Sequence, residues 1–322
     1  MIIKGNITRN LLLCSSYWMI SRSTGARALI FVVGLEKIYA VSTARSKEAS
    51  KQTKFQAVND GRRGRLGCDG SVLIDSTKNN TAEKDAPPNQ TLRGFGAIER
   101  IKRTIEHACP NTVSCADVLA IAARDSVVMS KGPNWPVWLG RRDGRVSIAN
   151  ETKQLPPPTA NFTRLTQMFG AKGLSIKDLV VLSAGHTIGT SHCSAFSDRL
   201  YNFTGKVNLN DIDPLMDTQY ISRMRTRCSL TDNTTLVEMD PGSFKTFDTS
   251  YYKFVAKGRG LFHSDASLLA NSFTKDYVFK HANGFESEFY QDFADSMISM
   301  GNVGVLTGNQ GEIRKKCYII NN

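Results

Sequence analysis

The residues most capable of chemistry lie in three short stretches, and the first of these contains His186. This histidine lies in the run VVLSAGHTIG (180–189), at the C-terminal end of an apolar helix and among small residues. Small neighbours leave room for a flat cofactor against the ring, and a neutral imidazole is a good axial ligand for haem iron. A lone helical histidine is more often a structural residue. This stretch alone therefore leaves both interpretations open.

The other two stretches contain carboxylates in unusual settings. Asp265 lies in the mostly apolar run LFHSDASLL (261–269), and a buried carboxylate needs a partner. A histidine that binds a metal usually gives its second N–H to such a group. In EMDPGSFKTFDTSYY (238–252), Asp240, Ser243 and Asp248 place hard oxygen ligands at the loop spacing of calcium sites. Ordinary turn chemistry would also explain that loop.

The elements that must position these residues are predicted to be helices. Residues 93–107 carry isoleucines at helical spacing and are followed by a proline. Ser114 with Asp117, and Ser175 with Asp178, have the spacing of capping boxes at two further helix starts. Strand signals are few, there is no internal repeat, and Pro156 begins a triple-proline loop. We therefore predict an all-α domain over 67–322.

The segment 1–66 differs from the rest of the chain in its composition and charge. It holds 12 of the 41 Lys and Arg residues and 3 of the 29 Asp and Glu residues, a net +9 of the chain's +12. It has no regularly interleaved aromatic residues, so we do not expect nucleic-acid binding. Its run Ala28–Leu35 fits either a signal-like segment or a buried strand or helix. No apolar run reaches the length of a membrane-spanning helix.

Two features indicate export. Six Asn-x-Ser/Thr sequons typical of a secreted glycoprotein occur after residue 66, at Asn79, Asn89, Asn150, Asn161, Asn202 and Asn233. The seven cysteines fit no zinc pattern and indicate a disulfide framework with an odd number of cysteines left over.

Taken together, these stretches resemble the class III, or secretory plant, haem peroxidases. The resemblance runs from Gly67 to about Tyr318, in family order, through GCDGSVLID, AEKDAPPN, RGF, CPNTVSCADVLAIAARDSV, GPNWPVWLGRRDG, LPPPTANF, DLVVLSAGHTIG, SHC, RLYNF, FDTSYY, GLFHSDASLL and MGNVGVLTGNQGEIRKKC. It implies the helical haem-peroxidase fold, haem b and calcium as cofactors, and hydrogen peroxide and small phenols as substrates.

The resemblance also implies roles for individual residues. His186 would be the axial iron ligand and Asp265 its carboxylate partner, with His192 at a haem propionate and Pro156 at the edge where aromatic substrates dock. The implied proximal calcium ligands are Thr187, Asp240, Ser243, Thr246 and Asp248. A partial distal calcium set comprises Gly67, Asp69, Ser71 and Glu83. The implied disulfides are Cys115–Cys317 and Cys193–Cys228, which leaves Cys14, Cys68 and Cys109 unpaired.

The chain departs from the family just before Gly67. Family members carry Arg, three residues and then His-Asp-Cys-Phe there, whereas this chain reads AVNDGRRGRL (57–66) and has no histidine before His107. The distal histidine and arginine, which promote peroxide cleavage, are therefore absent, and Asn89 loses the histidine that it would orient. Positioned acid–base catalysis is worth about 10²–10⁴-fold and electrostatic stabilisation about 10²–10³-fold. The fold is accordingly expected to lack its usual N-terminal helices.

Two functional hypotheses follow from this departure. In the first, the chain is a secreted peroxidase of the cell wall or vacuole, acting as a monomer in hydrogen peroxide removal. In the second, it is a catalytically impaired glycoprotein that binds calcium and haem. The abrupt change at Gly67 leads us to expect that 1–66 is a non-family leader, from a mispredicted first exon or an alternative transcript.

Overall fold

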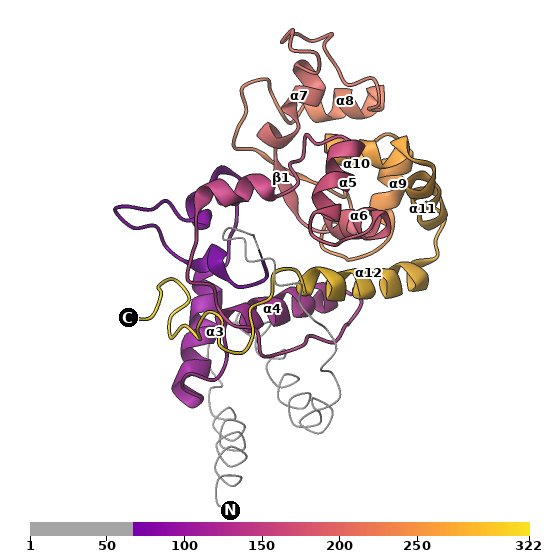
Figure 1. The fold of residues 1–322 in the computed structure, drawn as a ribbon. Coiled ribbons are helices and arrows are strands. Elements are labelled where there is room, and N and C mark those ends of the chain that lie inside the picture. The colour runs from indigo at the N-terminus through magenta and orange to yellow at the C-terminus, as the bar shows by residue number, and fades with distance from the viewer. Residues whose placement is uncertain (1–66) are drawn as a thin grey trace, which may run out of the picture. The chain divides into compact units, whose positions relative to one another are not determined.

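The computed structural model describes residues 67–322, and this part of the chain is mostly helical (Figure 1). Its internal contacts divide it into two compact units. The first comprises the described residues up to 126 together with 136–154 and 301–322, and the second comprises 127–135 and 155–300. None of the helices in 67–322 is both long and apolar enough to cross a bilayer.

The first unit is built around helix α3 (Phe95–Ala108) and most of helix α4 (Cys115–Met129). The apolar face of α3 packs on Leu73 and Val118, beside the Cys115–Cys317 disulfide. This agrees with the isoleucine spacing that predicted a helix over 93–107. The remaining elements of the unit are short 3₁₀ turns at Ser71–Leu73, Glu83–Asp85, Pro87–Asn89 and Ala149–Gln154.

The start of α4 confirms only half of the predicted capping box. The Ser114 hydroxyl accepts the Asp117 N–H at 3.0 Å, as predicted. The Asp117 carboxylate, however, accepts the backbone N–H groups of Gly140 and Arg141, at 2.8 and 3.2 Å. Asp143 instead accepts the first two N–H groups of the helix, at 3.1 and 2.8 Å. Tertiary partners have therefore replaced the local contact of Asp117.

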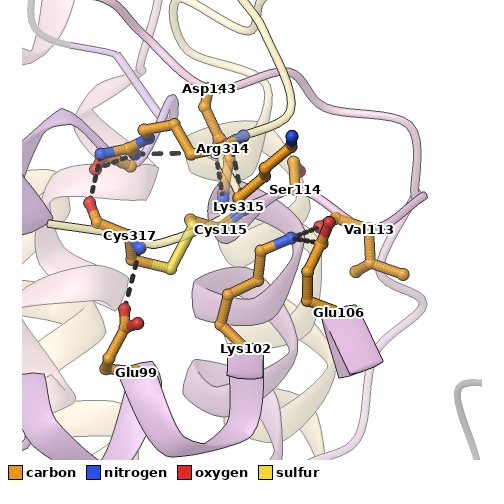
Figure 2. The surroundings of a disulfide bond; sticks show 12 residues. Glu99, Lys102, Glu106, Val113, Ser114, Cys115, Asp143, Arg314, Lys315 and Cys317 are labelled. Carbon is orange, nitrogen blue, oxygen red and sulfur yellow. Dashed lines mark hydrogen bonds and ion pairs between the residues drawn. A yellow bond between two sulfur atoms is a disulfide. The ribbon is translucent and has the colours of Figure 1, made fainter. Parts of the chain in front are cut away.

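Charged side chains surround the Cys115–Cys317 disulfide (Figure 2). Glu99 accepts the Cys317 N–H at 2.8 Å. Lys102 has no exposed side-chain surface, and its ammonium is held by the Glu106 carboxylate at 2.5 Å and the Val113 carbonyl at 2.7 Å. A buried ammonium needs such partners, so these contacts fix where α3 meets the segment leading to α4.

The second unit contains the other helices and the one two-stranded sheet among residues 67–322. Strand β1 (Thr190–His192) pairs antiparallel with β2 (Leu236–Glu238), with Ser191 opposite Val237. The helices are α5 (Phe162–Gly170), α6 (Ile176–Ser183), α7 (Ser197–Tyr201), α8 (Thr218–Arg225), α9 (Ser250–Ala256), α10 (His263–Ser267), α11 (Ser272–Ala282) and α12 (Glu286–Gly301), the last residue of which falls in the first unit.

Two local features stabilise this second unit. Helix α6 begins with the capping box predicted at Ser175 and Asp178, in which each side chain accepts the other's backbone N–H. Its aromatic core stacks Phe247 on Phe289, with ring centroids 5.6 Å apart, and sets Phe293 edge-on to Phe247 at 4.6 Å. Such aromatic pairs contribute about 0.5–1.5 kcal/mol each beyond the area they bury.

The structure forms the two disulfides that the family resemblance implies, Cys115–Cys317 and Cys193–Cys228. The prediction that Cys109 is unpaired is wrong, because Cys109 is disulfide-bonded. That prediction considered only the family's partner cysteine, whereas a disulfide requires only two suitably placed thiols. Cys14 lies outside the described residues, and Cys68 is half-buried.

The Cys115–Cys317 bridge links residues 202 positions apart. We predict that the double substitution Cys115→Ala and Cys317→Ala lowers the free energy of unfolding by about 2–5 kcal/mol, because the bridge restricts the unfolded chain. Urea denaturation of both proteins measures this difference. A loss below about 1 kcal/mol would show that the bridge adds little to the surrounding packing.

Candidate functional site

The centre of the candidate site is the contact between His186 and Asp265 in the second unit. His186 lies in the 3₁₀ turn Ala184–Thr187, directly after α6. Its Nδ1 is 2.9 Å from Oδ1 of Asp265, a residue 79 positions away in sequence. The Asp265 side chain is 2% exposed and that of His186 is 36% exposed. The histidine therefore points one nitrogen at a buried carboxylate and has part of its ring accessible.

The environment of Asp265 keeps it charged although it is buried. Burial alone would raise the pKa of Asp265, but His186 and hydrogen bonds to the carboxylate lower it on balance. The Tyr251 hydroxyl donates to Oδ1 at 2.8 Å, and the Phe262 N–H donates to Oδ2 at 2.9 Å. Because the carboxylate is an acceptor only, Nδ1 of His186 carries the hydrogen. No described residue hydrogen-bonds Nε2 of His186, so its lone pair is available to a metal ion.

Arg199 fixes the segment that leads into α10. Its side chain is 1% exposed, and Nε donates to Asp213 at 2.8 Å. Nη1 contacts the carbonyls of residues 260, 261 and 262 at 2.6–2.9 Å. The chain also passes close to Asp265 here, since a Cβ added at Gly260 would lie 2.7 Å from the Asp265 Cβ. A larger residue at position 260 would therefore displace the carboxylate.

A second cluster begins at the residue after His186. The Thr187 hydroxyl lies 2.8 Å from Asp240 Oδ2 and 3.4 Å from Asp248 Oδ1. The Ser243 hydroxyl donates to the other oxygen of Asp248. Thr246 belongs to the same turn, and its N–H donates to the Ser243 carbonyl at 2.7 Å. The structure therefore brings together four of the side chains predicted to bind the proximal calcium.

The chemistry of this cluster fits a hard cation. Asp240 has no exposed surface, and its Oδ1 has no hydrogen-bond partner. Burial raises the pKa of Asp240 to about 7; the Thr187 hydroxyl opposes this shift and the charge of Asp248 adds to it. Two carboxylates facing one another with an unsatisfied buried oxygen are costly unless a cation binds them. Calcium prefers carboxylate, hydroxyl and carbonyl oxygens such as these.

The first unit holds the residues predicted for a partial distal calcium set. Asp69 Oδ1 accepts the Ser71 N–H at 3.0 Å. Burial raises the pKa of Glu83 to about 7, against a hydrogen bond from the Ser71 hydroxyl. The charges of Asp69 and Glu151 add to that shift. Glu151 was not among the predicted residues, and no sequence signal connects it with Glu83. Gly67 is half-buried at the start of the described chain.

The remaining predicted residues, Asn89, Pro156 and His192, lie outside these two clusters and the distal set. Asn89, in the first unit, is 8% exposed, and its amide donates to the Glu83 carbonyl at 2.8 Å. Pro156 lies exposed in a loop of the second unit, and the Pro158 carbonyl in that loop accepts the Ser264 N–H at 2.9 Å. His192 lies on β1, where its Nδ1 is 3.2 Å from the Thr234 carbonyl. The loop of Pro156 is thus tied to the residue before Asp265.

Comparisons with known proteins identify the family that the chain resembles. A family model described as peroxidase matches residues 39–284, beginning upstream of Gly67. The chain is 71% identical over 257 residues to Peroxidase 1 of Oryza sativa subsp. japonica, which covers 79% of each chain. It is 55% identical over 255 residues to Peroxidase 27 of Arabidopsis thaliana, covering 79% of this chain and 78% of the relative. Peroxidase 56 of Arabidopsis thaliana is 54% identical over 256 residues, covering 79% and 77%.

The raised pKa of Asp240 predicts that cation binding to the cluster depends on pH. With that pKa near 7, a proton competes with the cation in the neutral range. We expect the calcium affinity to fall about tenfold between pH 8 and pH 6, because binding below the pKa must release the proton. Calorimetric calcium titrations at pH 6, 7 and 8 measure this trend. Asp240→Asn is the control and should bind weakly without that pH dependence. Equal wild-type affinities at pH 6 and pH 8 would contradict the prediction.

Proposed function

This chain belongs to the class III plant peroxidase family, and we propose that His186 is the axial iron ligand of its haem b, held and polarised by Asp265. Peroxidase is the function of the chain by close homology. The observation that carries the assignment is the 2.9 Å contact between Nδ1 of His186 and the buried, charged carboxylate. It leaves Nε2 without a partner among residues 67–322, which is how a histidine is presented to a metal.

Bound haem would supply the two-electron reduction of hydrogen peroxide and the one-electron oxidation of two phenol molecules. The task of this chain's residues is to hold and tune the iron. Asp265 accepts the Nδ1 proton of His186 and so makes the imidazole a stronger donor. Tyr251 donates to the same carboxylate oxygen, and this contact limits how far the proton shifts toward Asp265. The pair therefore sets the basicity of the ligand nitrogen.

Calcium at the proximal cluster would stabilise the position of His186. Thr187 follows the histidine and contributes its hydroxyl to the cluster. A cation there would neutralise Asp240 and Asp248 and fix the turn that carries the ligand. Family members hold two calcium ions. The sequence has all five residues of the proximal set, whereas the distal set of Gly67, Asp69, Ser71 and Glu83 lacks the aspartate of the His-Asp-Cys-Phe motif.

The substrates would be hydrogen peroxide and small phenols, with Pro156 at the docking edge and His192 near a haem propionate. We further propose a monomer exported to the cell wall or the vacuole. Class III peroxidases are secretory, and the disulfides are consistent with that route. Asn89 would support the distal side only if a histidine were supplied there.

A second candidate function, a catalytically impaired protein that binds haem and calcium, is favoured by one observation. The sequence has no histidine before His107, and residues 57–66 replace the family's distal His and Arg motif. The proximal residues would then bind haem, while proton transfer between the peroxide oxygens would lack its general acid–base group. Acid–base catalysis of this kind contributes about 10²–10⁴-fold.

The full chain with haem and calcium distinguishes the two functions. We expect a Soret band that is lost in His186→Ala, together with phenol oxidation at a rate comparable to that of rice Peroxidase 1 in a parallel assay. This result would support the haem ligand and the peroxidase function together, and it would place the acid–base group in residues 1–66. Phenol oxidation about 10²–10⁴-fold slower, with the Soret band still lost in His186→Ala, would instead support the impaired function. Haem binding that survives His186→Ala unchanged would contradict the assignment of the ligand.

A further inference from the structure

One buried histidine has no part in the function proposed above. His281, at the end of α11, has no exposed surface. Its ring packs against Tyr277 and Tyr252, with centroid distances of 4.1 and 5.7 Å. Nδ1 lies 3.2 Å from the Phe285 carbonyl, which can only accept a hydrogen bond, so Nδ1 carries the hydrogen. Nε2 is then a buried lone pair, and it has no hydrogen-bond partner.

Two carboxylates on α12 accompany this histidine. One ring nitrogen of His281 and one carboxylate oxygen each of Glu288 and Asp292 lie within 4.8 Å of one another. Glu288 and Asp292 are four residues apart and therefore lie on the same face of the helix. Asp292 is 8% exposed and Glu288 is exposed, so the cluster extends from the core to the surface.

The unsatisfied nitrogen distinguishes this cluster from an ordinary acidic surface. A buried polar atom without a partner destabilises the protein, and the nearby carboxylates, which are themselves acceptors, cannot donate a hydrogen bond to a lone pair. A metal ion would satisfy all three groups at once. The Phe285 carbonyl already holds the ring from behind, as the outer partner of a metal-binding histidine usually does. Burial also lowers the pKa of His281, which keeps the ring neutral and able to bind.

The two lysines that now pair with these carboxylates can be displaced by a metal ion. Lys177 lies 2.7 Å from Asp292 Oδ1, and Lys280 lies 2.7 Å from Glu288. Both lysine side chains are about half-exposed, at 50% and 43%, so they can turn into water when a cation takes their place. The Tyr277 hydroxyl, which donates to Asp292 Oδ2 at 2.8 Å, would stay and orient that carboxylate.

We propose that His281, Glu288 and Asp292 form a binding site for a divalent transition metal of the zinc type, in addition to the calcium cluster. One nitrogen and two carboxylate oxygens suit zinc, which binds such ligands at about 2.0–2.2 Å. Ligand atoms at those distances from a tetrahedral ion lie about 3.3–3.6 Å apart. Atoms that now lie as far as 4.8 Å apart would therefore close by about 1.2–1.5 Å. A water molecule on the exposed side of Glu288 would complete the coordination. Calcium prefers all-oxygen sites and would not compete for the imidazole.

The test is a calorimetric titration of zinc chloride into the full holoprotein in excess calcium. We expect one zinc ion per chain at this site and an affinity about tenfold or more weaker in Glu288→Gln. In His281→Phe, which keeps a ring in the aromatic core, this binding should be lost. The control is Asp276→Asn, which removes an exposed carboxylate of the same charge from α11 and should leave zinc binding unchanged.

Glu288→Gln is a surface substitution, so its result does not depend on whether His281→Phe folds. Absence of zinc binding to the wild-type chain would overturn the proposal. Zinc binding that is equally strong in Glu288→Gln and Asp276→Asn would also overturn it, because the ion would then lie elsewhere. The titration detects binding and not turnover, so the outcome is independent of the peroxidase assay.

Discussion

The hydrogen bond between His186 and Asp265 is the interaction on which the rest of the second unit's chemistry depends. A carboxylate 2% exposed would ordinarily take up a proton, yet burial is outweighed here by the histidine, a tyrosine hydroxyl and a backbone N–H. Arg199 holds the three carbonyls that precede α10, and the small residue at Gly260 allows the chain to pass beside the carboxylate. These contacts stabilise the negative charge of Asp265 in the interior and hold its carboxylate beside Nδ1 of His186.

The chain that carries His186 also connects it to the proximal cluster of Thr187, Asp240, Ser243 and Asp248. Thr187 is the residue after His186, and its hydroxyl contacts Asp240 and Asp248. Because Asp240 has a buried oxygen without a partner, the cluster without its ion is strained electrostatically. Calcium would remove that strain and fix the turn bearing the ligand. This electrostatic strain is the physical reason for the calcium that we propose on the proximal side, even though the cation would not contact the reacting molecules.

Much of this could be predicted from the sequence, for reasons that differ between residues. The helix over 93–107 and the capping box at Ser175 follow from local spacing, and the structure confirms both. The partnership of His186 and Asp265 came from the family resemblance, because 79 residues separate them. Arg199, Tyr251 and Glu151 were missed since their partners are chosen by tertiary packing. The capping box predicted at Ser114 and Asp117 is only half confirmed for the same reason. The Asp117 carboxylate accepts the backbone N–H groups of Gly140 and Arg141 instead of the N–H of Ser114.

We propose that the charge on Asp265 tunes the nitrogen with which His186 would bind the haem iron. The most direct measurement is the iron reduction potential of the haem-bound chain compared with Asp265→Asn, which keeps the shape and removes the charge. A hydrogen bond to a charged group is worth about 1.5–3 kcal/mol, or roughly 60–130 mV for one electron. We predict a potential higher by about that amount in Asp265→Asn, because the oxidised iron loses its stronger donor. A potential that changes by less than about 10 mV would contradict it.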